Sequence, residues 1–205
     1  MRIITGEAKG RRLISPRGTK IRPTADRVKE SLFNILGPRW EGVRVLDLFS
    51  GTGNLGLEAI SRGAHEAVFV EQSRAALEAL RKNISICGFE SKCTVLAMPV
   101  SRALARVRER GESFDLILAD PPYGKAWIAK TIREILTHKA LAPRGILVME
   151  HAPHESPPSD MGELVILNQR VYGDTVVSFL GFTVSDRPEG GGLSPPVGEP
   201  TSTNG

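Results

Sequence analysis

Cysteine and long apolar runs are what this 205-residue sequence has least of. Cys87 and Cys93 are too few for a disulfide framework and lack metal-ligand spacing, which fits a reduced intracellular setting. No apolar run approaches the roughly 18 residues of a membrane span. The N-terminal run M-R-I-I-T-G-E-A-K-G-R-R has no signal-peptide core. We therefore expect a cytoplasmic protein without a membrane partner.

The usual signs of metal and nucleophile chemistry are also missing. The four histidines, His65, His138, His151 and His154, show no metal-ligand spacing. No G-x-S-x-G nucleophile elbow occurs, and the two cysteines stand near the end of an expected helix and the start of an expected strand. We therefore expect no bound metal and no covalent nucleophile.

Positive charge is present in excess, and it is concentrated near the N-terminus. Residues 1–44 hold eleven of the 27 Lys and Arg residues but only four of the 23 Asp and Glu residues. The rest of the chain is mildly acidic. A basic segment on such a body is typical of a face that binds a polyanion, although a solvated basic surface would show the same composition.

Apolar runs alternate with helical periodicities through most of the chain. The expected strands are 43–48, 67–70, 94–97, 114–119 and 145–149. Helices are expected between them, for example through Leu77, Leu80 and Ile84, opened by Ser73 and closed near Gly88. Buried parallel strands joined by helices predict a doubly wound α/β sheet.

Both ends of the chain depart from this alternation. Residues 2–22 indicate a short hairpin and a loop, and a helix follows from an N-cap at Thr24 to Gly37-Pro38. The runs 164–171 and 175–182 predict a final antiparallel hairpin. We thus expect an N-terminal basic extension over 1–40, one domain over 41–184 and, because 185–205 is almost free of apolar residues, a disordered tail.

A glycine-rich loop follows the first strand of the alternating region. The stretch L-D-L-F-S-G-T-G-N-L-G contains Gly51-x-Gly53-x-x-Gly56, a spacing that brings backbone close to an adenosine cofactor. Glu71 ends the next strand, 20 residues after Gly51, where a carboxylate can bind both ribose hydroxyls. These features fit NAD and S-adenosylmethionine equally well.

Asp47 discriminates between the two cofactors. A carboxylate at the end of the strand before the loop repels a pyrophosphate, whereas it attracts the ammonium group of S-adenosylmethionine. The same carboxylate could instead cap backbone N–H groups of the loop.

The segment Asp120-Pro121-Pro122-Tyr123 ends the fourth strand and should lie at the same sheet edge as the glycine loop. The two prolines remove N–H donors, so the segment presents carbonyl oxygens and a carboxylate as acceptors around one point. A planar amine with two N–H donors suits such a site, and Tyr123 can stack on its ring. In-line methyl transfer to that amine would depend mainly on positioning. The alternative is a rigid turn that ends the strand.

These motifs resemble the class I S-adenosylmethionine-dependent methyltransferases that act on exocyclic amines. The N-terminal runs G-x-x-x-G-R-R-L and I-R-P-T-A-D-R-V-K-E-S-L-F-N-I-L are more specific and resemble the RsmD family, which methylates N2 of a guanine in 16S ribosomal RNA. The resemblance covers about residues 2–182. It implies a Rossmann-like seven-stranded methyltransferase sheet and a substrate of 16S rRNA, in the small subunit or its assembly intermediate. We expect a monomer.

The resemblance also implies roles for matched positions. The cofactor would be bound by Asp47, Phe49, Ser50, Gly51, Thr52, Gly53, Gly56, Glu71, Gln72 and Ser73. The base would be gripped by Asp120, Pro121, Pro122 and Tyr123, and the RNA side would comprise Arg11, Arg12, Arg22, Thr24 and Arg27. Met98 departs from the pattern, because such enzymes usually have Asp or Asn there to contact the adenine.

Four rival interpretations remain. DNA adenine-N6 methyltransferases also use D-P-P-Y but normally need an added target-recognition region, and protein glutamine methyltransferases usually have Asn where Asp120 stands. An NAD-binding redox module would need a proton relay that the sequence does not provide. An RNA-binding assembly factor with an inert cofactor fold is the non-enzymatic alternative.

Overall fold

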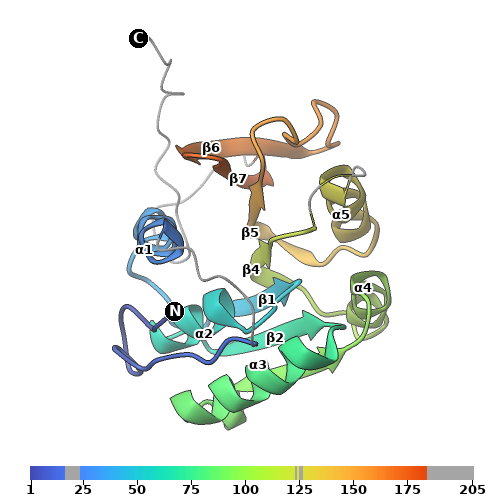
Figure 1. Ribbon diagram of the computed structural model, residues 1–205. Helices are drawn as coiled ribbons and strands as arrows, with labels where there is room; N and C mark the ends of the chain where they lie inside the picture. Colours follow the sequence, from blue (N-terminus) through green and yellow to red (C-terminus); the bar gives the residue numbers. More distant parts are fainter. Residues whose placement is uncertain (17–23, 123, 125–126, 184–205) are drawn as a thin grey trace.

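The computed structural model describes residues 1–16, 24–122, 124 and 127–183, and one seven-stranded sheet forms its centre (Figure 1). The strands are β1 (Arg44–Leu48), β2 (Glu66–Glu71), β3 (Cys93–Ala97), β4 (Phe114–Ala119), β5 (Leu141–His151), β6 (Leu164–Tyr172) and β7 (Thr175–Phe182). Their order is β3-β2-β1-β4-β5-β7-β6. Strands β1 to β5 run parallel, and β7 is antiparallel to both β5 and β6. The predicted α/β sheet with an antiparallel final hairpin is confirmed.

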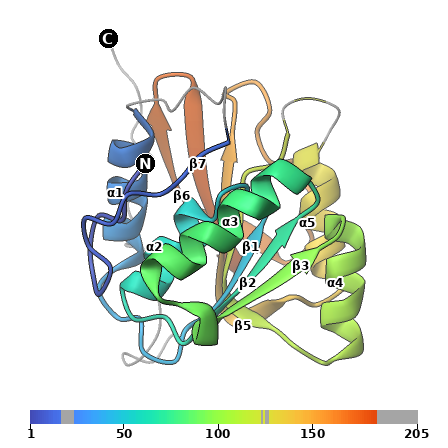
Figure 2. The same ribbon diagram turned by 60° about the horizontal axis from the view of Figure 1, so that its bottom comes forward.

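Helices cover both faces of the sheet. They are α1 (Thr24–Leu36), α2 (Asn54–Ser61), α3 (Arg74–Cys87), α4 (Val100–Glu109) and α5 (Trp127–Thr137), with a short 3₁₀ helix η1 (Glu90–Lys92). Residues of α1, α2 and α3 pack into one core cluster, and residues of α4 and α5 pack into the other. Figures 1 and 2 show α1 on the side of the sheet opposite to α4 and α5.

The central strands explain this two-sided arrangement. In β1, Val45 belongs to the first cluster and Leu46 to the second, and both are fully buried. Successive side chains of a strand point to opposite faces, so a strand covered on both faces must be apolar throughout. The strand order reverses between β1 and β4, and this reversal creates a crevice at the carboxyl ends of the strands, where ligands of open α/β sheets bind.

Helix ends follow the local signals in the sequence. Gly37 comes directly after α1 with φ 83°, and Gly88 ends α3 with φ 76°. Glycine reaches this left-handed conformation without a Cβ clash, so both helices stop where the sequence predicts. The final hairpin turns through Gly173 and Asp174, since Tyr172 is already paired with Thr175.

The fifth strand differs from the expectation, whereas the N-terminal hairpin agrees with it. The fifth strand is longer than 145–149 and begins at Leu141, with a register irregularity opposite Phe114 and Leu116. Gly145 makes this possible, because a Cβ there would lie 2.8 Å from the Phe114 carbonyl oxygen. The expected short N-terminal hairpin is present: Arg2 and Arg12 form an antiparallel bridge, and Ile3 donates to the Arg11 carbonyl at 3.0 Å and accepts from the Gly10 N–H at 2.9 Å.

The N-terminal segment packs against the body of the protein. Ile3, Ala8 and Leu13 are buried in the cluster that also contains α1 and α2. Among the residues that the structure describes, no helix is long and apolar enough to cross a membrane. The predicted tail over 185–205 lies outside the described residues.

Candidate functional site at the carboxyl edge of the sheet

The glycine loop makes a tight turn between β1 and α2. Phe49, Gly51 and Gly53 all have positive φ, at 59°, 55° and 79°. The Ser50 N–H donates to the Val70 carbonyl at 3.0 Å, which fixes the loop against the end of β2. A Cβ added to Gly51 would meet no atom within 4 Å, so the loop backbone borders open space on that side. This is the close backbone approach that an adenosine cofactor requires.

Gly56 serves a different purpose from the first two glycines. A Cβ there would lie 2.4 Å from Cε1 of Phe69 and 2.9 Å from Oδ2 of Asp47. Its missing side chain therefore lets α2 lie close against the sheet, which is the role of the third glycine in this spacing.

Asp47 lies within β1 as its penultimate residue and is 4% exposed. Its Oδ2 accepts a hydrogen bond from the Gly56 N–H at 2.9 Å, so the capping role considered for this carboxylate is observed. Burial, together with the nearby carboxylates of Asp120 and Glu71, raises the pKa of Asp47 to about 7 against the lowering effect of the Gly56 bond. A cation placed beside Asp47 would restore its ionised form.

The Glu71 carboxylate connects the glycine loop after β1 to the turn between β2 and α3. Its Oε2 accepts from the Gly51 N–H at 2.8 Å, and its Oε1 accepts from the N–H groups of Gln72 and Ser73 at 2.8 and 2.7 Å. Ser73 is the N-cap residue of α3, as expected, but its side chain makes no capping bond. A carboxylate oxygen has further lone-pair capacity, so these bonds leave Glu71 able to accept from ribose hydroxyls.

Asp120 follows β4 directly, and its carboxylate lies near enough to Asp47 to raise the pKa of that group. Burial raises its pKa to about 6, although the side chain keeps one face open to solvent. Pro121 is buried and Pro122 is exposed, while Tyr123 lies outside the described residues. The structure thus brings Asp47, Glu71 and Asp120 together from three parallel strands or their ends, as a locally negative region.

Glu155, in the loop between β5 and β6, makes a contact near the end of β4 that the sequence did not predict. One of its carboxylate oxygens accepts a hydrogen bond from the Gly124 N–H, in the peptide that follows Tyr123. Gly124 has φ 84°, a conformation that favours glycine. No spacing in the sequence signals this contact, because 31 residues separate the two partners.

An aromatic contact joins the glycine loop to α5. Phe49 and Trp127, the first residue of α5, meet edge to face with ring centroids 6.1 Å apart. The Lys130 ammonium lies 4.9 Å from the centroid of Trp127. Trp127 was missed by sequence reasoning, since a single aromatic residue before an amphipathic helix is typical of ordinary core packing.

The RNA-side residues are only partly described. Arg11, Arg12 and Arg27 are exposed, and a guanidinium nitrogen of Arg11 donates to the Ile86 carbonyl at 2.9 Å. Arg22 and the side chain of Thr24 lie outside the part of the chain that the structure describes. Met98 is half-buried after β3, packed against the second core cluster.

Comparison with known proteins identifies relatives over nearly the whole described chain. The family model described as conserved hypothetical protein 95 matches residues 1–181. The chain belongs to this family. The YlbH protein of Bacillus subtilis is 37% identical over 87% of this chain and 97% of its own length. Ribosomal RNA small subunit methyltransferase D of Escherichia coli is 32% identical, covering 84% of this chain and 85% of its own.

Solved structures of family relatives share the fold. The yhhF protein of Escherichia coli superimposes with a TM-score of 0.79 at 31% identity, over 89% of this chain and 97% of its own. The Thermus thermophilus protein TTHA0928 superimposes with a TM-score of 0.76 at 31% identity, over 88% of this chain and 99% of its own. The resemblance to the RsmD family and the class I methyltransferase fold that it implies are both confirmed.

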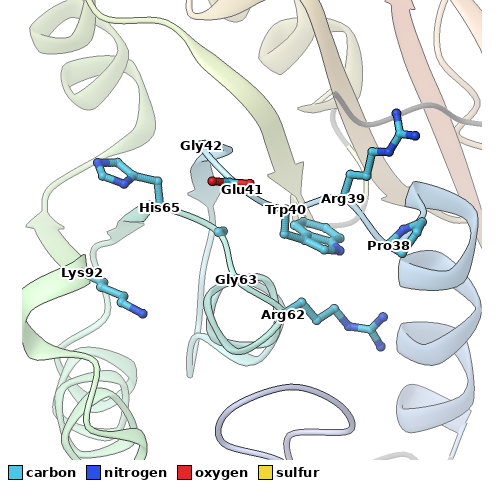
Figure 3. Close-up of a pocket in the computed structure, with 10 residues that line it drawn as sticks. Pro38, Arg39, Trp40, Glu41, Gly42, Arg62, Gly63, His65 and Lys92 are labelled. Atoms are coloured by element: carbon cyan, nitrogen blue, oxygen red, sulfur yellow. The ribbon is translucent and has the colours of Figure 1, made fainter. Parts of the chain in front are cut away.

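A second hollow of about 730 Å³ lies at the opposite edge of the sheet, where β1 and β2 begin (Figure 3). Arg39, Arg62, His65 and Lys92 surround it together with Glu41. Arg62 is already paired with Glu58 at 3.0 Å. Among the described residues, no three His, Cys, Asp or Glu side chains come together as metal ligands. The candidate site remains the carboxyl edge, where the glycine loop lies near Asp47, Glu71 and Asp120.

Proposed function

We propose that this member of the family transfers a methyl group from S-adenosylmethionine to the exocyclic N2 amine of a specific guanine in 16S ribosomal RNA. The observation that carries the proposal is the meeting of Asp47, Glu71 and Asp120 beside an open glycine loop. Three carboxylates suit a cofactor with an ammonium and a sulfonium, and they disfavour the pyrophosphate of NAD.

The chain's own residues fit this cofactor. Asp47 would pair with the ammonium group, and Phe49, Ser50, Gly51, Thr52 and Gly53 would border the methionine part. Glu71 would accept from the ribose, and Gln72 and Ser73 would lie beside the adenine, which packing and backbone would hold in the absence of an acidic side chain at Met98. S-adenosylmethionine supplies the electrophilic methyl group when bound.

The target amine is positioned by the strand end after β4. The Asp120 carboxylate and the neighbouring carbonyl oxygens accept the two N–H groups of the amine, while Pro121 and Pro122 hold the backbone rigid. Tyr123 would stack on the guanine. Accepting both N–H groups would hold the nitrogen lone pair out of conjugation with the ring, and Asp120 or solvent would take the proton that the amine loses as its new N–C bond forms. Because a guanine N2 inside a duplex is inaccessible to such a pocket, the base must be unstacked first.

The exposed arginines of the N-terminal segment and α1 supply the RNA affinity. Arg11, Arg12 and Arg27, which are exposed, would contact phosphates, and so would Arg22 and Thr24 on the same stretch of chain. Phosphate contacts give binding that weakens with salt and carries little sequence information. The proposed substrate is therefore a folded surface of the small subunit or its assembly intermediate, bound by a monomer in the cytoplasm.

The decisive experiment is tritiated-methyl transfer to naked 16S rRNA, to small ribosomal subunits and to DNA, followed by nucleoside analysis. The expected product is N2-methylguanosine in 16S rRNA. Methyladenine in DNA, methylglutamine in a ribosomal protein, or no transfer from a cofactor-binding protein would each overturn the proposal.

Asp120→Ala should lower methyl transfer by at least about 100-fold, because the side chain that accepts an N–H group of the amine is lost. Cofactor affinity should change little. Asp174→Ala, in the exposed turn between β6 and β7, provides the matched control and should keep full activity. Full activity of the Asp120 variant would refute the amine-gripping role.

A further inference from the structure

Four buried polar side chains hold the N-terminal segment, residues 1–14, and none of them was expected from the sequence. They are Lys29 of α1, Glu58 and Ser61 of α2, and Asn83 of α3, each 3% exposed or less. Buried polar groups are costly unless they are hydrogen-bonded, so such a group indicates a specific arrangement that the fold maintains.

Asn83 binds the segment and the glycine loop at the same time. Its Oδ1 accepts from the Ile14 N–H at 2.7 Å. Its Nδ2 donates to the Ile14 carbonyl at 3.0 Å and to the Thr52 carbonyl at 2.9 Å. One fully buried amide therefore fixes the backbone of Ile14 relative to the backbone of Thr52.

Lys29 makes the same kind of link on the other side of Gly53. Its ammonium donates to the Arg2 carbonyl at 2.6 Å and to Oδ1 of Asn54 at 2.8 Å. It also pairs with Glu58 at 3.2 Å, and Glu58 in turn accepts from the N–H groups of Ile4 and Thr5 at 2.8 and 3.0 Å. The segment is thus connected to the loop at Thr52 and at Asn54, directly before and after Gly53.

We infer that Asn83 and Lys29 are positioning residues that couple the cofactor loop to the N-terminal segment, so that cofactor bound at the loop stabilises the segment carrying Arg11 and Arg12. This inference rests on the proposed function for the identity of the cofactor and for the RNA-binding role of the arginines. A ligand that restricts the loop favours the Asn83 and Asn54 contacts, and linkage requires the segment to favour the ligand equally. RNA and cofactor would then bind with positive cooperativity.

Amide hydrogen exchange of the full chain, with and without saturating S-adenosylhomocysteine, tests the coupling without RNA. In the unaltered protein, the ligand should slow exchange at Ile4, Thr5 and Ile14 by about fivefold or more, within the usual range of coupling between sites. No slowing at these amides, with the ligand demonstrably bound, would overturn the inference and leave the proposed function intact. Absence of ligand binding would instead contradict the proposed function.

Two variants separate the two links. Asn83→Leu should abolish the ligand-induced slowing at Ile14 and retain it at Ile4 and Thr5. Asn54→Ala, which removes only the Lys29 contact to the loop, should show the reverse pattern. Lys82→Leu, the exposed neighbour of Asn83 on α3, serves as the matched control and should respond like the unaltered protein.

The outcome remains decisive if Asn83→Leu does not fold. Asn83→Asp keeps the acceptor for the Ile14 N–H and loses both donated bonds, so it should lose the response at Ile14 alone. A loss of equal size at all three amides in both variants would indicate general loosening of the fold and would refute a specific link.

Discussion

At the scale of single residues, Asp47 combines a structural bond with a charge that the fold disfavours. Its pKa is raised from 3.8 to about 7, chiefly by burial. Between these values the folded protein binds more protons than the unfolded chain does. The free energy of unfolding therefore decreases as the pH rises through this window.

We expect the cofactor-free protein to lose on the order of 3 kcal/mol of unfolding free energy from Asp47 between pH 4 and pH 8. Asp47→Asn should remove that contribution, because an amide can still accept from the Gly56 N–H and does not titrate. Urea unfolding across the pH range would measure both proteins. If unfolding free energy depended on pH in the same way in both proteins, Asp47 would not be the group responsible.

At the scale of elements, the loop between β5 and β6 supports the strand end after β4. The Glu155 carboxylate binds the Gly124 N–H, which fixes the peptide next to Tyr123. Glu155→Ala should lower kcat by about tenfold while cofactor affinity stays constant, since a small displacement of a positioning segment is costly for methyl transfer. Glu155→Gln should recover part of the rate, because its amide oxygen can accept the same bond.

The control for this prediction is His154→Ala, an exposed neighbour in the same loop. It should leave kcat unchanged. A change in cofactor affinity equal to the change in kcat for Glu155→Ala would point to general disturbance of the crevice instead of the strand end.

Elements with local signals were predictable from the sequence, and long-range polar contacts were not. Gly37 and Gly88 end helices because the backbone needs a left-handed residue there, which a sequence pattern can reveal. Lys29 and Asn83 occupy polar positions next to apolar helix stripes and look like solvated surface residues. Their partners are backbone atoms 27 and 69 residues away, so no local pattern carries the information.

The candidate site also contains some features with local sequence signals and others that depend on long-range contacts. The spacing of the glycine loop and Asp47 were enough to predict a cofactor edge, because both depend on residues close in sequence. Glu155 and Trp127 entered the site only through the tertiary fold, which brings α5 and the β5–β6 loop beside the end of β4.

At the scale of the whole molecule, the uneven charge predicts a salt-dependent substrate interaction. Arg12→Glu should weaken binding to 16S rRNA or small subunits. It should also reduce the slope of log affinity against log salt by about 1 for each phosphate that is no longer neutralised. Cofactor affinity should be unaffected. Titrations at several salt concentrations provide the measurement.

Arg133→Glu makes the same charge change on an exposed position of α5, on the opposite face of the sheet from α1. It should leave the salt slope closer to that of the unaltered protein. If both variants weakened binding equally, overall charge and not the N-terminal face would govern RNA affinity.

The docking of the N-terminal segment has a consequence for how substrate preference can change. The body binds this segment through its main chain, at the carbonyl of Arg2 and the N–H groups of Ile4, Thr5, Ala8 and Ile14. The exposed side chain of Arg12 is not needed for these bonds, whereas the Arg11 guanidinium adds a bond of its own to the Ile86 carbonyl of α3. Exposed side chains of the segment can therefore change to suit a different RNA surface, whereas the length and backbone path of the segment cannot.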